Sequence, residues 1–143
     1  MPTRKATAEW NGSVKQGSGT IGVESGTLSG ADYSFQGRFE GGDGTNPDEL
    51  LGAAHAGCYS MALSLALGDN GHEPESIETT AKVTIDEVDG DPEITGIELV
   101  TSAKVPDISD EDFQSVANAA KDGCPLSKAL KAVDISLDAT LES

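Results

Sequence analysis

The sequence has only two cysteines, Cys58 and Cys124, in 143 residues. Two thiols are too few for a framework of structural disulfides, and in the cytoplasm thiols stay reduced. If the two cysteines pair, we therefore expect a transient, redox-linked bond. The sequence also lacks an uninterrupted apolar run long enough to cross a bilayer, and its N-terminus, MPTRKATAEW, lacks the apolar core of a signal peptide. We expect a soluble cytoplasmic protein that does not enter a membrane.

Basic residues are also scarce. Nine Lys and Arg stand against 25 Asp and Glu, which gives a formal net charge of −16 at pH 7. Because such a surface repels phosphate groups, we expect neither nucleic acid nor an anionic membrane as a partner. An acidic surface also suits a high-salt environment, where ions screen the self-repulsion.

Several common motifs are absent as well. The sequence contains no Walker loop, no G-x-G-x-x-G and no C-x-x-C. Zinc would need Cys58, Cys124 and His55 with a fourth ligand, and no ligand spacing supports such a set. The only other histidine, His72, is too far along the chain to make a histidine-rich site. We therefore expect no metal and no bound cofactor, and the chemistry narrows to the two cysteines.

The length suits a single domain over residues 1–143. Alternating patterns predict three short strands in the first forty residues, at 6–12, 19–25 and 33–39. In the third strand, Tyr33, Phe35 and Phe39 would share one face and Arg38 the other. A glycine-rich bend, EGGDGTN, follows. Next, Asn46 as N-cap, Pro47 and Glu49 mark the start of a helix that runs to about Leu67.

The second half predicts a hairpin, two helices and a last strand. Strands at 76–88 and 93–105 alternate in phase around an Asp-Gly turn. A helix follows the Ser109 cap and ends at Gly123, Cys124 and Pro125 open a short helix, and a strand covers 133–143. The order βββ-α-ββ-α-α-β predicts an α+β fold built on antiparallel sheet.

Local context makes Cys124 the more reactive thiol, because it opens a helix where free N–H groups favour an anion. Cys58 lies in the middle of a helix and needs a cation from elsewhere in the fold. Arg38, beside the glycine-rich bend, is the candidate, although a solvated strand residue explains it equally well. Glu49 is likewise explained by helix capping alone.

Two motifs add to this reasoning. The run NPDELLGAAHAGCYSMALSLAL, together with CPLSKAL near the C-terminus, resembles the osmotically inducible protein C and organic hydroperoxide resistance (OsmC/Ohr) family, specifically its OsmC branch. The similarity covers essentially the whole chain in the same element order. It implies a thiol peroxidase that reduces organic hydroperoxides to alcohols. The implied fold is α+β, with antiparallel sheets around two central helices, in an intertwined homodimer with two active sites at the subunit interface.

The resemblance also implies roles for four residues. Cys58 would be the peroxidatic cysteine, Cys124 the resolving cysteine, Arg38 the cation beside the thiolate, and Glu49 the carboxylate that orients Arg38. The cycle would pass through a Cys58 sulfenate and a Cys58–Cys124 disulfide, which an external dithiol of the dihydrolipoyl type would reduce.

Helix geometry adds one more prediction. Glu49 and Cys58 are nine residues apart, which places them about 180° apart on an unbroken helix. Either the helix breaks at Gly52 or Gly57, or the forked guanidinium of Arg38 spans the gap between the two side chains. We predict a break near residues 52–55. His55 would share a helix face with Cys58, so a Cys/His hydrolase stays open as an alternative. A non-enzymatic stress or binding protein with two inert thiols is the third possibility.

Overall fold

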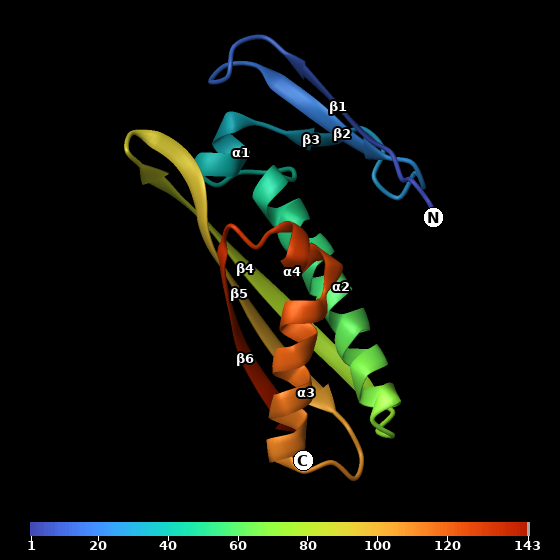
Figure 1. Cartoon of the computed structure of the whole chain (residues 1–143). Coiled ribbons are helices and arrows are strands. Elements are labelled where there is room, and N and C mark those ends of the chain that lie inside the picture. Colours follow the sequence, from blue (N-terminus) through green and yellow to red (C-terminus); the bar gives the residue numbers. More distant parts are fainter. Residues whose placement is uncertain (143) are drawn as a thin grey trace. The chain divides into compact units, whose positions relative to one another are not determined.

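The computed structural model describes residues 1–142 of the chain (Figure 1). The chain divides into two compact units, a first unit of Met1–Leu50 and a second unit that begins at Leu51. The long helix α2 (Pro47–Asp69) starts in the first unit and continues in the second. The single domain over residues 1–143 stays a prediction, and the two units are described in turn.

The first unit holds a three-stranded antiparallel sheet in the order β1 (Ala6–Asn11), β2 (Ser18–Val23) and β3 (Ala31–Tyr33). Gly19 on β2 pairs with Trp10 on one side and Tyr33 on the other, and the two rings lie 5.3 Å apart. A Cβ atom at Gly19 would come within 2.5 Å of the Tyr33 ring, so glycine is required there. No large apolar side chain of residues 1–50 is buried in the single chain.

The predicted strand at 33–39 is wrong, because β3 ends at Tyr33 and a short helix, α1 (Phe35–Phe39), follows. Ser34 caps this helix: its Oγ accepts a hydrogen bond of 3.0 Å from the backbone N–H of Gly37. Phe35 and Phe39, four residues apart, bring their ring centroids to 4.9 Å, as neighbours on one helix face do. Arg38 therefore lies in the last turn of a helix.

Helix α2 starts as predicted and runs without the predicted break. Asn46 Oδ1 accepts a hydrogen bond of 2.8 Å from the backbone N–H of Glu49, which confirms the N-cap. The break near residues 52–55 is wrong, since α2 is one helix from Pro47 to Asp69. Gly52 instead allows close packing on the sheet, because a Cβ atom there would lie 3.2 Å from the side chain of Val83.

Helix α2 is long and apolar enough, by length and composition, to cross a membrane, which we did not expect from the sequence. The central helix of a soluble protein can have the same character. Tyr59, Leu63 and Leu67 are completely buried against the rest of the second unit. These contacts place α2 in the core of the second unit.

The second unit contains a three-stranded sheet in the order β4 (Ser76–Val88), β5 (Asp91–Lys104) and β6 (Asp134–Glu142). The hairpin of β4 and β5 is confirmed, and Asp89 and Gly90 both have positive φ at its turn. The predicted α+β fold built on antiparallel sheet is confirmed, with one difference: β6 runs parallel to β5. The last predicted residue of the strand, Ser143, lies outside the described residues.

The parallel pairing is possible because two helices lie between β5 and β6. A parallel connection needs a crossover of a dozen or more residues, and α3 (Asp110–Gly123) and α4 (Pro125–Ala129) provide it. The predicted cap of α3 is confirmed, since Ser109 Oγ accepts a hydrogen bond of 3.1 Å from the N–H of Asp112.

The core lies between one face of this sheet and the helices α2 and α3 (Figure 1). The hydroxyl of Tyr59 on α2 donates a hydrogen bond of 3.1 Å to the carbonyl of Ala117 on α3. The buried apolar side chains of the sheet, α2 and α3 are Tyr59, Leu63, Leu67, Ile97, Leu99, Ala103, Phe113, Ala117 and Ala120. This packing brings the middle of α2 next to the junction of α3 and α4, where the two cysteines lie.

Candidate active site

The two cysteines are neighbours in the second unit. Cys58 projects from the middle of α2, and Cys124 lies between the end of α3 and the start of α4. Both are free thiols, and their Sγ atoms are 3.0 Å apart although 66 positions separate them in the sequence. A disulfide bond measures about 2.05 Å, so the two sulfurs need to approach by only about 1 Å to form one. The structure thus places the two cysteines side by side, and their catalytic roles stay a prediction.

Access from solvent distinguishes the two thiols. Cys124 is completely buried, whereas Cys58 is only partly buried. A reagent in solution therefore reaches the Cys58 sulfur more readily than the Cys124 sulfur.

The surroundings of the pair favour ionisation of Cys124. Burial raises the pKa of Cys124, but hydrogen bonds from Cys58, from the backbone and hydroxyl of Ser127 and from the backbone of Leu126 together lower it below the usual value. Burial raises the pKa of Cys58, and the hydrogen bond with the side chain of Cys124 raises it further. A hydrogen bond with the backbone of Leu126 offsets part of this increase. The prediction from local sequence context that Cys124 is the more reactive thiol agrees with these directions of the two pKa shifts. A Cys58 thiolate needs a cation that these neighbours do not supply.

In the first unit, the guanidinium of Arg38 makes a bidentate contact with the carboxylate of Asp48. The guanidinium Nε lies 3.0 Å from Asp48 Oδ2, and Nη2 lies 3.2 Å from Oδ1. The Asp48 side chain is only 10 % exposed and that of Arg38 33 %. A bidentate, partly buried pair of this kind fixes the plane and the position of the guanidinium.

Within the single chain, Glu49 does not contact Arg38, and its orienting role stays a prediction. The carboxylate of Glu49 accepts a hydrogen bond of 3.0 Å from the side-chain amide of Asn46, the residue that caps α2. Glu49 is thus occupied by the helix start, as its capping pattern indicated. The capping pattern could have identified Asp48 as the partner of Arg38. It assigns Glu49 to the helix cap, which leaves Asp48 as the other acidic residue of the first turn.

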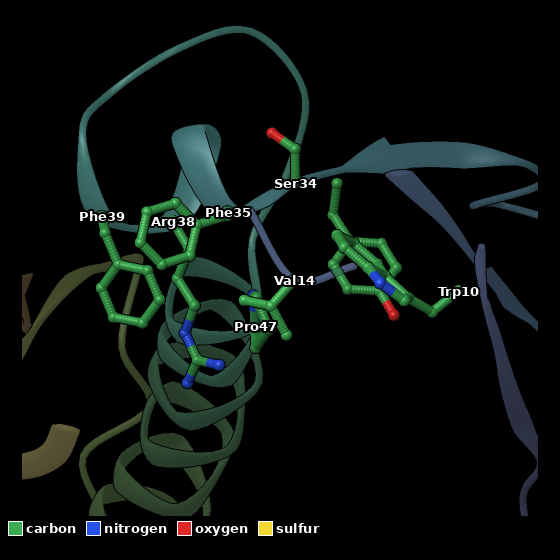
Figure 2. A pocket seen from close by; sticks show the side chains of 8 residues that line it. Trp10, Val14, Ser34, Phe35, Arg38, Phe39 and Pro47 are labelled. Atoms are coloured by element: carbon green, nitrogen blue, oxygen red, sulfur yellow. The ribbon is translucent and has the colours of Figure 1, made fainter. Parts of the chain in front are cut away.

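A pocket of about 210 Å³ adjoins Arg38 within the first unit (Figure 2). The side chains of Trp10, Phe35 and Phe39 project around it, and Arg38 extends along one side. The guanidinium carbon lies 5.3 Å from the centre of the Phe39 ring, a distance typical of a cation–π contact. The full lining is Trp10, Val14, Tyr33, Ser34, Phe35, Arg38, Phe39 and Pro47. The pocket therefore offers an apolar wall with one cation.

His55 is completely buried, and its Nε2 lies 2.9 Å from Ser127 Oγ on α4. Its hydrogen-bond partner is thus Ser127 and not Cys58, which does not favour the Cys/His hydrolase. Ser127 was missed from the sequence, although it follows Cys124 by three residues in the same motif. Within residues 1–142, no three His, Cys, Asp or Glu side chains are arranged to hold a metal ion.

A family model described as OsmC-like protein matches residues 40–138, which include all of these residues on α2 and α4. The chain belongs to the OsmC-like protein family. The resemblance of the two cysteine motifs to this family is thereby confirmed.

Relatives within the OsmC-like family support the assignment along the whole chain. The chain is 51 % identical over 140 residues to peroxiredoxin OsmC of Escherichia coli, covering 98 % of this chain and 97 % of the relative. It is 39 % identical over 101 residues to the organic hydroperoxide resistance protein OhrB of Bacillus subtilis, covering 69 % and 72 % of the two chains. The crystal structure of OhrB superposes with a TM-score of 0.72 at 29 % identity and covers 98 % of each chain.

Proposed function

We propose that this protein is a thiol-dependent peroxidase that reduces organic hydroperoxides to alcohols. The observation that supports it most is the pair of free thiols 3.0 Å apart, one accessible and one buried. The relatives called peroxiredoxin and organic hydroperoxide resistance protein point to the same chemistry.

The proposed cycle has three balanced steps. The Cys58 thiolate attacks the terminal oxygen of the hydroperoxide; the O–O bond breaks, the alkoxide takes a proton and leaves as alcohol, and Cys58 becomes a sulfenic acid. The Cys124 sulfur then attacks the Cys58 sulfur, which forms the disulfide and releases water. An external dithiol, which we propose to be of the dihydrolipoyl type, restores both thiols and is itself oxidised to a disulfide.

Arg38 is proposed to provide the cation that the Cys58 thiolate lacks among its own neighbours. Asp48 takes the positioning role first given to Glu49, because it holds Nε and Nη2 of the guanidinium. One N–H group of Nη2 and both of Nη1 remain for the thiolate and for the peroxide oxygens. The apolar pocket beside Arg38 suits the organic part of the substrate and disfavours hydrogen peroxide.

We also propose a cytoplasmic homodimer. Met61 and Leu65 on α2 are 76 % and 68 % exposed in the single chain, and the first unit buries no large apolar side chain. Exposed apolar side chains on a core helix indicate a protein partner, and a second copy of the chain fits the family.

The proposal is tested by counting free thiols before and after one equivalent of cumene hydroperoxide. We expect both thiols to disappear within seconds, and mass spectrometry of unreduced peptides to find Cys58 linked to Cys124. Hydrogen peroxide at the same concentration should react more slowly. If both thiols survive, the protein is one of the non-enzymatic alternatives; if only ester cleavage is found, it is the hydrolase.

Replacement of Asp48 by Asn should slow the oxidation of Cys58 by cumene hydroperoxide, by up to about 100-fold, the effect of misplacing a group by about 1 Å. Asn keeps the size of the side chain but loses the charge that holds the Arg38 guanidinium. The measurement is stopped-flow oxidation of Cys58 without reductant.

Glu49→Gln is the matched control, because it removes the same charge from the next residue. It should stay within about twofold of the unmodified protein, as surface substitutions do. A larger effect of Glu49→Gln than of Asp48→Asn would return the positioning role to Glu49.

A further inference from the structure

Four of the six aromatic residues of the chain line the pocket beside Arg38: Trp10, Tyr33, Phe35 and Phe39. Large aromatic side chains usually supply a buried core, yet none of these four is buried, and Phe39 is 42 % exposed. Residues 1–50 bury no large apolar side chain in the single chain, so core packing does not explain why the rings gather here. Partly exposed apolar side chains that gather in one place indicate a binding surface.

The rings are held in place by contacts of their own. Trp10 donates a hydrogen bond of 3.0 Å from Nε1 to the carbonyl of Gly12, and its ring lies 5.3 Å from the ring of Tyr33. Phe35 and Phe39 lie 4.9 Å apart on the short helix α1. Trp10 stands on one side of the pocket, and Phe35 and Phe39 stand on the other (Figure 2). A pocket whose walls are already ordered loses little freedom when a ligand binds.

The geometry of the two ring pairs favours an aromatic ligand. The planes of Trp10 and Tyr33 are tilted by 57°, and those of Phe35 and Phe39 by 46°. Aromatic rings prefer such tilted or offset contacts, in which the edge of one ring meets the face of another. A ring placed between the two pairs can make contacts of this kind on both sides. A saturated group of the same size makes only ordinary apolar contacts.

The charge of the wall favours a neutral ligand. Clusters of aromatic rings also bind quaternary ammonium ions. Here, however, the guanidinium of Arg38 already lies 5.3 Å from the centre of the Phe39 ring and would repel a second cation. An anion gains little, because the bidentate pair with Asp48 offsets the charge of Arg38. A neutral aromatic group is the class that fits both conditions.

The volume limits the ligand to about one ring. The pocket measures about 210 Å³. Since a water molecule takes about 30 Å³ in the liquid, this space corresponds to about seven non-hydrogen atoms at that density. The closer packing of organic groups raises the number to about ten. A phenyl ring with a short branched substituent has this size, whereas a long acyl chain has about twice as many atoms.

We propose that this pocket selects hydroperoxides whose O–OH group stands on the carbon next to an aromatic ring, with Trp10 and Phe35 as specificity-determining residues. The inference rests on the proposed function, in which the peroxide oxygens are bound by Arg38. Arg38 extends along one side of the pocket (Figure 2). A ring in the pocket therefore leaves the adjacent carbon and its hydroperoxide group next to the guanidinium. A long-chain hydroperoxide would leave most of its chain outside this pocket.

The test compares two alcohols of the same size that cannot oxidise a thiol: cumyl alcohol, the product of cumene hydroperoxide reduction, and its analogue with a saturated cyclohexyl ring. Trp10 is the only tryptophan of the chain, so its fluorescence reports binding in this pocket. We expect cumyl alcohol to bind about two- to tenfold more tightly, which is the gain that aromatic pairs show beyond their contact area. The two corresponding hydroperoxides should show the same preference in kcat/KM.

Phe35→Leu should bring the ratio of the two affinities close to one, because Leu keeps an apolar side chain but has no ring. Val14→Ala is the matched control, since Val14 lines the same pocket without a ring. It also shortens an apolar side chain of the wall, so both alcohols should lose affinity alike and the ratio should stay as it was.

Equal affinities for the two alcohols in the unmodified protein would overturn the inference. It would also be overturned if neither alcohol changes the fluorescence of Trp10, as expected where a second copy of the chain fills the pocket. A preference that persists in Phe35→Leu would contradict the role given to Phe35. If this variant does not fold, the two alcohols on the unmodified protein decide alone.

The alcohols also separate this inference from the proposed function, because neither of them is an oxidant. A protein that prefers cumyl alcohol but consumes no hydroperoxide would contradict the proposed peroxidase and leave the aromatic site standing. A protein that consumes both hydroperoxides at equal rates and binds both alcohols equally would contradict only the aromatic selection.

Discussion

Replacement of Cys58 by Ser is expected to reduce the turnover of cumene hydroperoxide by more than about a thousandfold, as loss of a catalytic nucleophile does. A serine hydroxyl at this position has no thiolate character, and no other accessible thiol exists in the sequence. Cys124 cannot substitute for it, because Cys124 is completely buried. The measurement is steady-state peroxide consumption with a dihydrolipoyl dithiol as reductant.

Cys124→Ser is the matched variant, since it removes the other thiol from the same site. It should consume the first equivalent of peroxide at nearly the normal rate and then stall, with Cys58 held as a sulfenic acid that dimedone traps. Excess peroxide should carry Cys58 on to the sulfinic acid. If Cys124→Ser, like Cys58→Ser, fails to consume even the first equivalent of peroxide, Cys124 is needed before the sulfenate forms, and the assigned roles would have to change.

Leu65→Glu is expected to convert the proposed dimer into a monomer of 14.7 kDa. Leu65 is 68 % exposed in the single chain, next to Met61 on the same helix face, and a second chain would cover both. A glutamate buried at that contact without a partner costs several kcal/mol. The measurement is light scattering after gel filtration, at moderate salt so that the −16 charge of each chain is screened.

Ala119→Glu is the control for added charge, because Ala119 is exposed on helix α3 and gains the same carboxylate. It should leave the dimer intact. A dimer that survives Leu65→Glu would place the interface away from this face of α2. An unmodified protein that is already a monomer would remove the proposal of a homodimer.

Local signals predicted much of the fold correctly. Asn46, Ser109 and the Asp89-Gly90 turn act on residues within four positions of themselves, so their hydrogen bonds and backbone angles could be inferred from the sequence. A local pattern also gave a wrong prediction at residues 33–39, where the alternation of aromatic side chains predicted a strand. The Ser34 cap and the four-residue spacing of Phe35 and Phe39 were helical signals that the alternation concealed.

From the sequence alone we could predict that the chemistry rests on two thiols, that one opens a helix and the other lies within a helix, and that the motifs around them resemble one family. The fold itself was needed to show that β6 runs parallel to β5, that Asp48 holds Arg38, and that His55 contacts Ser127. The physical reason is separation along the chain. Capping and turn geometry depend on adjacent residues, whereas contacts between residues as many as 72 positions apart depend on how the helices pack on the sheet.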